Sequence, residues 1–373
     1  MPHEPHTLAL IREAIQAASG QQIPFSQFMN LALYGCDDSY YRRSDRPIGR
    51  KGDFYTSVSV GEMFGIALAE WIASEWEKLG KPAEFTLIEQ GAHDGTLMLD
   101  ILAQLKSSHQ SCREAVQPII IEPFPTAQSR QRETLKDHLD TIHWASDWAE
   151  VPEQAQDGII YSNELLDAFP VERLRRGKHH WKQLVVEEGD DTELASASRP
   201  VKPGSDLAHQ IDNTRGLDFD ALERNHIVEL NPAIEPWLKN AAGTLRRGAI
   251  LVIDYGFGAD DYYHPSHADG QLRTYFDHAA IDDPLQHIGN SDITAHVDFT
   301  WLADCASRLD LKPRRLVDQG KFLIDAARNW LLALEQSGLA AEPAAQKLLR
   351  QFNTLTHPGN MGRKFKVQVI DLG

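Results

Sequence analysis

The sequence predicts an α/β fold in which a mostly parallel, doubly wound sheet is covered by helices on both faces. Helical patterns at residues 96–105 and 126–138 separate short apolar runs. This alternation is typical of parallel strands that are joined by crossover helices and buried on both faces. The apolar runs predicted as strands are 85–89, 119–122, 159–161 and 250–254.

The N-terminal part of the chain predicts two helices, a loop and a third helix. Apolar residues recur at the helical period over 7–18, and a second helix follows Pro24 and ends at Gly35. Residues 37–59 are polar and contain glycine and arginine, which indicates a loop. A strong amphipathic helix is then predicted over 61–78, because its apolar side chains again recur at the helical period.

The later part of the chain adds two insertions to this pattern. An Arg-Gly-Lys turn with flanking valines predicts a hairpin over 174–187. Residues 257–295 are rich in Asp, His, Gly and Tyr and predict a long functional loop. The remaining predicted elements are helices at 231–246, 298–309, 322–337 and 342–352 and strands at 313–317 and 365–370.

Composition and charge restrict the class of protein. The chain has 373 residues, of which 42% are hydrophobic and 24% charged, as in ordinary globular proteins. Its formal charge of −17 argues against a protein that binds nucleic acid through the phosphates. The same charge would favour a basic segment in a partner protein, although an acidic surface also serves solubility alone.

Cysteines, histidines and the N-terminal residues exclude several further classes. Cys36, Cys112 and Cys305 lie far apart, and the histidines lack metal-binding spacing, so we expect neither a disulfide framework nor a metal site. The first residues include acidic side chains and no long apolar run, which predicts neither a signal peptide nor a membrane span. We therefore expect a reducing, cytoplasmic setting and no membrane partner.

The segment FTLIEQGAHDGTLMLDIL carries the strongest functional signal. A predicted strand ends at Glu89, and a turn from Gly91 to Gly95 opens the helix at Thr96. Glycine permits positive φ and close approach of a ligand to the backbone. Strand ends beside helix N-termini form the ligand crevice of such sheets. The dinucleotide pattern G-x-G-x-x-G is absent, and a purely structural tight turn would also explain the two glycines.

Two carboxylates favour a binding role for this turn. Glu89 stands two residues before Gly91, where it could bind the ammonium group of a methionine-like moiety but would repel a pyrophosphate. Glu122 ends the next predicted strand, and an acidic residue at that point typically accepts hydrogen bonds from ribose hydroxyls. A solvent-exposed glutamate at a strand end is the alternative interpretation of Glu122.

Polar residues also follow the strand at 159–161, in the segment IIYSNELLDAFP. Asn163 and Glu164 stand at its carboxyl end, where this fold class places catalysis, and Asp167 follows. On an incipient helix Glu164 and Asp167 would share one face and could hold a guanidinium or polarise an amine. Helix capping by Asn163 together with a structural salt bridge would explain the same residues.

The chain resembles the S-adenosylmethionine (SAM)-dependent methyltransferases related to mitochondrial dysfunction protein A. That family includes the mitochondrial arginine methyltransferase that assists complex I assembly. The resemblance covers residues 23 to 370 and rests on the segments FMNLALY, GRKGDFYTS, MFGIALAEW, EQGAHDGTLMLDIL, SNELLDAFPV, LVIDYGF, DITAHVDF and MGRKFKV.

The resemblance implies a seven-stranded, Rossmann-like methyltransferase sheet in which 365–370 is an antiparallel strand near one edge. It implies a methyltransferase domain over 61–373, with a hairpin insertion near 171–230 and a helical insertion near 320–355. Residues 1–60 would form an N-terminal helical segment with a loop that closes over the cofactor.

The resemblance also implies which residues contact SAM. Asp53, Phe54 and Thr56 match a family segment that helps to shape the cofactor site. His93 replaces the central glycine of the family turn E-x-G-x-G-x-G, and we expect the bulkier turn to adopt an allowed conformation. The other residues expected to bind SAM are Glu89, Gly91, Ala92, Gly95, Glu122 and Asn163.

We therefore expect a SAM-dependent methyltransferase that acts on arginine of a partner protein. The candidate catalytic residues are Glu164, Asp167 and His296. In DITAHVDF, His296 is either a proton acceptor near the substrate or a structural histidine, and Asp298 should cap a helix. The alternatives are an assembly chaperone that binds SAM without turnover, which His93 keeps open, and a small-molecule methyltransferase. The sequence does not indicate the oligomeric state.

Overall fold

The structure is a computed structural model that describes residues 6–43, 56–152, 157–190 and 193–373. The chain forms two compact units, each assembled from three segments. Unit 1 comprises Met1–Phe54, Leu166–Pro236 and Gly256–Leu302, and unit 2 comprises Tyr55–Leu165, Trp237–Tyr255 and Ala303–Gly373. The N-terminal helices therefore belong to the same unit as the hairpin insertion. The expected division at residue 60 instead placed them in separate domains.

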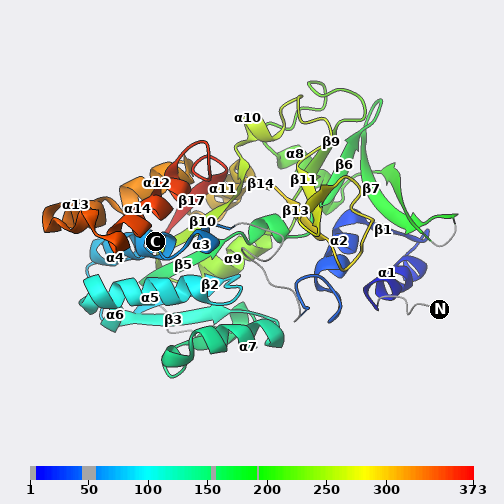
Figure 1. Ribbon diagram of the computed structural model, residues 1–373. Helices are drawn as coiled ribbons and strands as arrows, with labels where there is room; N and C mark the ends of the chain where they lie inside the picture. The colour runs from blue at the N-terminus through cyan, green and yellow to red at the C-terminus, as the bar shows by residue number, and fades with distance from the viewer. Residues whose placement is uncertain (1–5, 44–55, 153–156, 191–192) are drawn as a thin grey trace. The chain divides into compact units, whose positions relative to one another are not determined.

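The main sheet is built by unit 2 and has the strand order β15-β17-β10-β5-β2-β3-β4, with β16 beside β17 (Figure 1). The strands β4, β3, β2, β5 and β10 are parallel, and β17 runs antiparallel between β10 and β15. This order confirms the doubly wound prediction and the antiparallel last strand. The bounds are β2 Phe85–Gln90, β3 Val116–Ile121, β4 His143–Ala145, β5 Asp157–Asn163, β10 Arg247–Phe257, β15 Lys312–Pro313, β16 Val317–Asp318 and β17 Phe365–Leu372.

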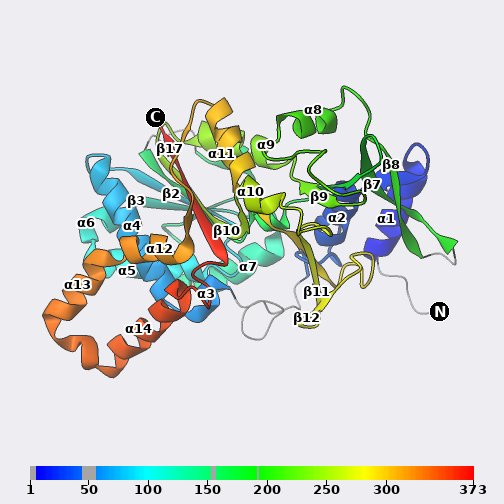
Figure 2. The same cartoon turned by 90° about the horizontal axis from the view of Figure 1, so that it is seen from above.

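Helices cover both faces of this sheet (Figures 1 and 2). The helices α4 and α5 lie on one face. The helix α9 lies on the other face, where Trp237 donates its indole N–H to Gln90 of β2 at 2.7 Å. The helices with residues in unit 2 are α3 Ser57–Val60, α4 Met63–Lys78, α5 Thr96–Ser108, α6 Gln110–Ala115, α7 Pro125–Thr134, α9 Ile234–Thr244, α11 Phe299–Arg308, α12 Gln319–Ala326, α13 Arg328–Ser337 and α14 Pro343–Thr356. Short 3₁₀ turns lie at Lys136–His138, Trp148–Glu150 and Leu339–Ala341.

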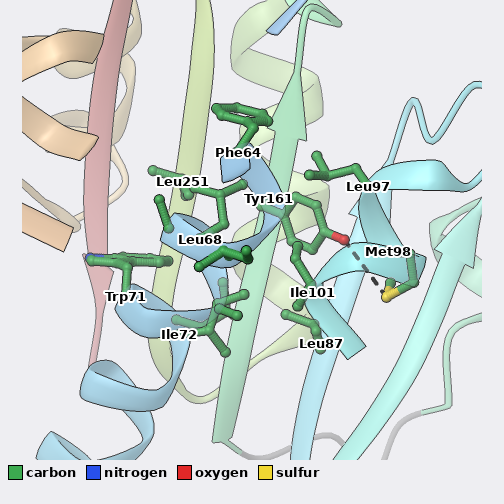
Figure 3. Close-up of a cluster of buried hydrophobic side chains, with 14 of the residues drawn as sticks. Phe64, Leu68, Trp71, Ile72, Leu87, Leu97, Met98, Ile101, Tyr161 and Leu251 are labelled. Carbon is green, nitrogen blue, oxygen red and sulfur yellow. Dashed lines mark hydrogen bonds between the residues drawn. The ribbon is translucent and has the colours of Figure 1, made fainter. Parts of the chain in front are cut away.

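The core of unit 2 lies between the sheet and the pair α4 and α5 (Figure 3). Alternate residues of each strand point to this face, so Leu87, Tyr161 and Leu251 meet Leu68 of α4 and Ile101 of α5. Thirteen of the sixteen residues of α4 are buried. The predicted helix is confirmed, but its amphipathic character is not, because α12 and α14 also contact α4.

Unit 1 contains two smaller sheets. The predicted hairpin is confirmed as β6 (Glu172–Arg176) and β7 (Trp181–Glu188). It is extended by β1 (Gln22–Pro24), β8 (Leu194–Pro200) and β9 (Ile227–Leu230) into a five-stranded sheet. The helices α1 (His6–Ala17) and α2 (Phe25–Tyr34) bury their apolar faces in a core that includes Val171, Val186 and Ile293. The remaining elements of unit 1 are η3 Leu166–Ala168, α8 Asp206–Asn213, α10 Ala259–Tyr262, β11 Leu272–Phe276, β12 Ala279–Ile281, β13 Asp292–Ala295 and β14 Val297–Asp298.

Two other predictions of secondary structure are corrected. Residues 257–295 are not a long loop, because β11 pairs with both β12 and β13 in a three-stranded sheet. The helix expected at 322–337 is two helices, α12 and α13, which meet at Ala327. Within the described ranges, no helix combines the length and the apolar character needed to span a bilayer.

Candidate functional site

The turn between β2 and α5 requires glycine at both of its predicted positions. Gly91 has φ +81° and Gly95 has φ +84°, both in the left-handed region. A Cβ atom on Gly91 would lie 3.1 Å from Leu165 Cδ1, and one on Gly95 would lie 2.8 Å from Leu135 Cδ1. Backbone conformation and close packing therefore both disfavour a side chain at Gly91 and Gly95.

His93, which stands where the family has its central glycine, is accommodated in this turn. It has φ +49°, a left-handed conformation that histidine adopts more readily than most residues other than glycine. The next residue, Asp94, accepts a hydrogen bond from the N–H of Thr96, the first residue of α5, at 3.0 Å. Burial alone would raise the pKa of Asp94, but the His93 ring, whose Nδ1 lies 3.7 Å from Asp94 Oδ1, and the hydrogen bond from Thr96 lower it to about 2. The turn is thus closed by a carboxylate that is ionised at neutral pH.

Glu89 is a buried carboxyl group at the end of β2. Only 3% of the residue is exposed, and its Oε2 accepts a hydrogen bond from the hydroxyl of Tyr161, its partner on β5, at 3.0 Å. The same hydroxyl lies 3.7 Å from the sulfur of Met98 (Figure 3). Burial, with a smaller contribution from Asp94, raises the pKa of Glu89 to about 8. A bound cation would offset this desolvation, so the site favours a positively charged group.

Glu122 follows β3 and is also buried, with 7% of the residue exposed. The alternative of a solvent-exposed glutamate is therefore wrong. Its Oε1 accepts the N–H of Phe124 at 3.0 Å, and its Oε2 accepts the side-chain amide of Gln131 at 3.0 Å. Burial raises the pKa of Glu122 despite these hydrogen bonds. Because the Gln131 amide also donates to the carbonyl of His93 at 3.3 Å, Glu122 is tied to the β2–α5 turn.

Asn163 and Glu164 form a second polar turn, at the end of β5. The side-chain amide of Asn163 donates to Glu164 Oε1 at 3.0 Å, and the N–H of Ser57 donates to the same oxygen at 3.3 Å. The backbone N–H of Glu164 bonds to the carbonyl of Ile253 at 2.9 Å. The N–H of Leu165 bonds to Asp254 Oδ2 at 3.1 Å. These bonds hold the turn against the ends of neighbouring segments of unit 2.

The expected geometry of Glu164 and Asp167 is corrected. Glu164 has φ +53°, so it is not in a right-handed helical conformation and does not share a helical face with Asp167. Asp167 instead lies in the 3₁₀ turn Leu166–Ala168 of unit 1, where it is buried. It contributes to the raised pKa of Tyr41, after burial, Asp292 and Tyr34. The capping interpretation of Asn163 also fails, because its side chain donates to Glu164 rather than accepting from a helix.

His296 lies in unit 1 within a network of side chains. Its Nδ1 is 2.9 Å from Gln271 Oε1, and its ring packs edge-on against Phe257. Burial, with contributions from Arg273 and His267, lowers the pKa of His296 to about 4, so the ring is neutral at pH 7. These contacts suit a structural histidine, and the catalytic role remains a prediction. The cap by Asp298 is confirmed, because its Oδ1 accepts from the N–H groups of Thr300 at 2.9 Å and Trp301 at 3.1 Å.

Of the other predicted site residues, Ala92 and Thr56 are described by the structure. Ala92 is buried in the β2–α5 turn, and its carbonyl accepts the N–H of Gly95 at 2.7 Å. Thr56 caps α3 by accepting the N–H of Ser59 at 3.1 Å. Asp53 and Phe54 lie outside the described residues. Among the residues that the structure describes, no group of three or more histidine, cysteine, aspartate or glutamate side chains is arranged to hold a metal ion.

Sequence reasoning missed three residues of these turns: Ser57, Gln131 and Asp254. Each acts through a hydrogen bond to a residue at least nine positions away. Asp254 does end a predicted strand, as Glu89 and Glu122 do, and that shared position was a usable signal. Ser57 and Gln131 carry no comparable signal, because neither stands at the end of a predicted strand.

The chain is similar in sequence and in structure to known methyltransferases. A family model for S-adenosyl-L-methionine-dependent methyltransferases matches residues 67–317. A protein from Burkholderia thailandensis, crystallised with S-adenosyl-homocysteine (SAH), superposes with a TM-score of 0.80 at 26% identity, covering 100% of this chain and 95% of that one.

Curated relatives match over most of their length. The Drosophila melanogaster protein arginine methyltransferase NDUFAF7 homolog, mitochondrial, is 29% identical over 92% of this chain and 80% of its own. The human protein arginine methyltransferase NDUFAF7, mitochondrial, is 27% identical over 92% of this chain and 78% of its own. The expectation of a cytoplasmic setting is contradicted, because these relatives are mitochondrial proteins.

Proposed function

Because this chain belongs to the family of S-adenosyl-L-methionine-dependent methyltransferases, we propose that it methylates an arginine side chain of a partner protein. The relatives that match most of the chain are named protein arginine methyltransferases. The observation that carries the proposal is the buried Glu89, which stands at a strand end directly before a turn with no Cβ atoms at Gly91 and Gly95. This combination fits a cationic ligand that approaches the backbone closely.

The described residues fit SAM, which when bound supplies a methyl group on a positively charged sulfur. In the proposal, Glu89 accepts hydrogen bonds from the ammonium group of the methionine moiety. Glu122 accepts hydrogen bonds from the ribose hydroxyls, and Gln131 fixes its orientation. The backbone from Gly91 to Gly95, including Ala92, lines the cofactor. Thr56 is proposed to contribute to the cofactor site.

Recognition of arginine needs acceptors, because a guanidinium stays protonated in water and carries five N–H donors. Glu164 stands at the end of β5 and supplies a carboxylate on a turn that is held by hydrogen bonds from Asn163 and Ser57. We propose that this carboxylate orients the guanidinium. Asp167 and His296 stay candidates for a second role. The formal charge of −17 supports a substrate segment that is basic.

The raised pKa of Glu89 gives a prediction for pH dependence. An ammonium ligand should bind the ionised form, so binding lowers a pKa that is about 8 without ligand and releases a proton. Affinity for SAH should therefore rise about tenfold from pH 6 to pH 7 and level off near pH 8, where the amino group of the ligand also begins to lose its proton. Titration calorimetry at these pH values measures the change.

Glu89→Gln is the matched control for this titration. Glutamine keeps the size and the acceptor for Tyr161 but cannot titrate. Its affinity for SAH should be weaker at pH 8 and nearly constant between pH 6 and pH 7. A wild-type affinity that does not change over this range would show that Glu89 does not bind the ammonium group.

The reaction itself is tested with tritiated-methyl SAM, purified chain and a lysate, followed by hydrolysis of the labelled protein and identification of the labelled amino acid. We expect labelled methylarginine in protein. Label on lysine or on a small metabolite would overturn the arginine proposal and leave methyl transfer intact. SAH binding without any labelled product would instead support a binding protein without turnover.

A further inference from the structure

Asn163 carries a buried oxygen for which the described part of the structure provides no hydrogen-bond donor. This atom, Oδ1, is buried and has no hydrogen-bond partner among the described residues, although the residue as a whole is only half-buried. The other end of the amide, Nδ2, donates to Glu164 Oε1 at 3.0 Å. Since a carboxylate only accepts, this bond fixes which end of the amide is the acceptor. Burying an acceptor without a donor costs free energy, so a donor from a bound molecule would account for it.

The position of Asn163 places this oxygen at the centre of the carboxyl edge of the main sheet. Its strand, β5, lies between β2 and β10. Asn163 is paired with Ile253 of β10, and the preceding residue, Ser162, is paired with Gln90 of β2. Asn163 is therefore level with Gly91, the first glycine of the proposed cofactor turn. Ligands of doubly wound sheets bind outside this edge.

The turn that follows Asn163 contains a residue in a strained conformation and is held by several hydrogen bonds. Glu164 has φ +53°, which is unfavourable for glutamate. The turn is held by the bonds from the backbone N–H groups of Glu164 and Leu165 to Ile253 and Asp254, and from Ser57 to the Glu164 carboxylate. A strained residue that is fixed by several hydrogen bonds is typical of a preorganised functional turn.

We propose that Asn163 Oδ1 accepts a hydrogen bond from an N–H of the group that receives the methyl, so that Asn163 binds the substrate rather than the cofactor. The inference rests on the proposed function and adds a second acceptor to it. The Asn163 oxygen and the Glu164 carboxylate belong to adjacent residues that are joined by a hydrogen bond. A planar guanidinium can donate to two such acceptors at once, which would fix the direction of its nitrogen atoms.

The test compares Asn163→Ala with Ser162→Ala. Ser162 is the adjacent residue, is 1% exposed, and also has a side-chain oxygen without a partner among the described residues. Successive strand residues point to opposite faces, so Ser162→Ala controls for the loss of a buried polar atom at this strand end. For Asn163→Ala, kcat/KM should fall roughly tenfold to a hundredfold. Ser162→Ala should stay near wild type.

SAH affinity, measured by calorimetry on the same preparations, separates substrate binding from cofactor binding. We expect Asn163→Ala to bind SAH within about twofold of wild type, a free-energy change below about 0.4 kcal/mol on a scale of about 1.4 kcal/mol per tenfold. Asn163→Leu, which has a similar size and no acceptor, repeats the measurement in case the alanine variant is unstable. Wild-type turnover in either variant, or a loss of SAH affinity as large as the loss of turnover, would overturn the assignment.

The outcomes also separate this inference from the proposed function. If wild-type protein labels lysine or a metabolite, the arginine proposal fails, and the Asn163 variants are measured on that acceptor. If wild-type protein labels arginine and Asn163→Ala is fully active, only the Asn163 inference fails. If wild-type protein binds SAH and labels nothing, both fail, because there is no accepting nitrogen for Asn163 to hold.

Discussion

Replacing Gly91 by valine should abolish binding of SAM and SAH, with an affinity loss of at least about a hundredfold, roughly 2.7 kcal/mol. The residue has φ +81°, and a Cβ atom would already lie 3.1 Å from Leu165 Cδ1. The branched side chain would press against Leu165 and displace the turn backbone that is proposed to line the ligand. Calorimetry with SAH measures the loss.

Gly80→Val is the matched control for this variant. Gly80 also belongs to unit 2 and has φ +88°, but a Cβ atom added there would have no heavy atom within 4 Å. Both variants bear the same cost of a left-handed valine, about 1–2 kcal/mol, so the difference between them reports on the turn itself. If Gly91→Val is folded and binds SAH as tightly as Gly80→Val does, the β2–α5 turn is not the cofactor site.

Replacing Glu164 by glutamine should reduce methyl transfer by at least about a hundredfold, the low end for a group that acts electrostatically on the reacting atoms. Glutamine keeps an oxygen that can accept the hydrogen bonds from Asn163 and Ser57, so the turn should persist while the charge is lost. Steady-state rates with the labelled substrate measure the effect. SAH affinity should change little, because the proposed cofactor carboxylates Glu89 and Glu122 lie on β2 and after β3.

A Glu164→Gln enzyme with wild-type turnover would show that the Glu164 carboxylate is structural and only links Ser57 to Asn163. The same rate measurement on Asp167→Asn decides whether the second predicted carboxylate participates. A reduced rate with unchanged SAH affinity would support it. A wild-type rate would assign Asp167 to the packing of unit 1 beside Tyr41.

The parts of the fold that local patterns specify were predictable. Short apolar runs placed β2, β3, β5 and β10, and the last strand was found where β17 lies. The pairing of β1, β8 and β9 with the hairpin was not predictable, because pairing between distant segments of the chain produces no periodic pattern of apolar residues in the local sequence. The amphipathic prediction for α4 failed for a similar reason, since α12 and α14 are distant in sequence.

The candidate site divides in the same way. Glu89, Gly91 and Gly95 lie in one contiguous motif, so their arrangement followed from strand, turn and helix geometry. The prediction that Glu164 and Asp167 share one helical face failed because that arrangement requires a right-handed helical backbone from one to the other. Glu164 has a left-handed conformation, which the sequence does not indicate. The cytoplasmic expectation failed because it rested only on missing signals.

The most direct test of the central claim is calorimetric titration of the purified wild-type chain with SAH at pH 8, where about half of Glu89 is ionised before the ligand binds. The claim is that the turn from Glu89 to Gly95, with Glu122, forms the cofactor site. It predicts one site with a dissociation constant in the micromolar range, roughly −8 kcal/mol. Folded protein that gives no binding heat and no displacement of labelled SAM at millimolar SAH would contradict it.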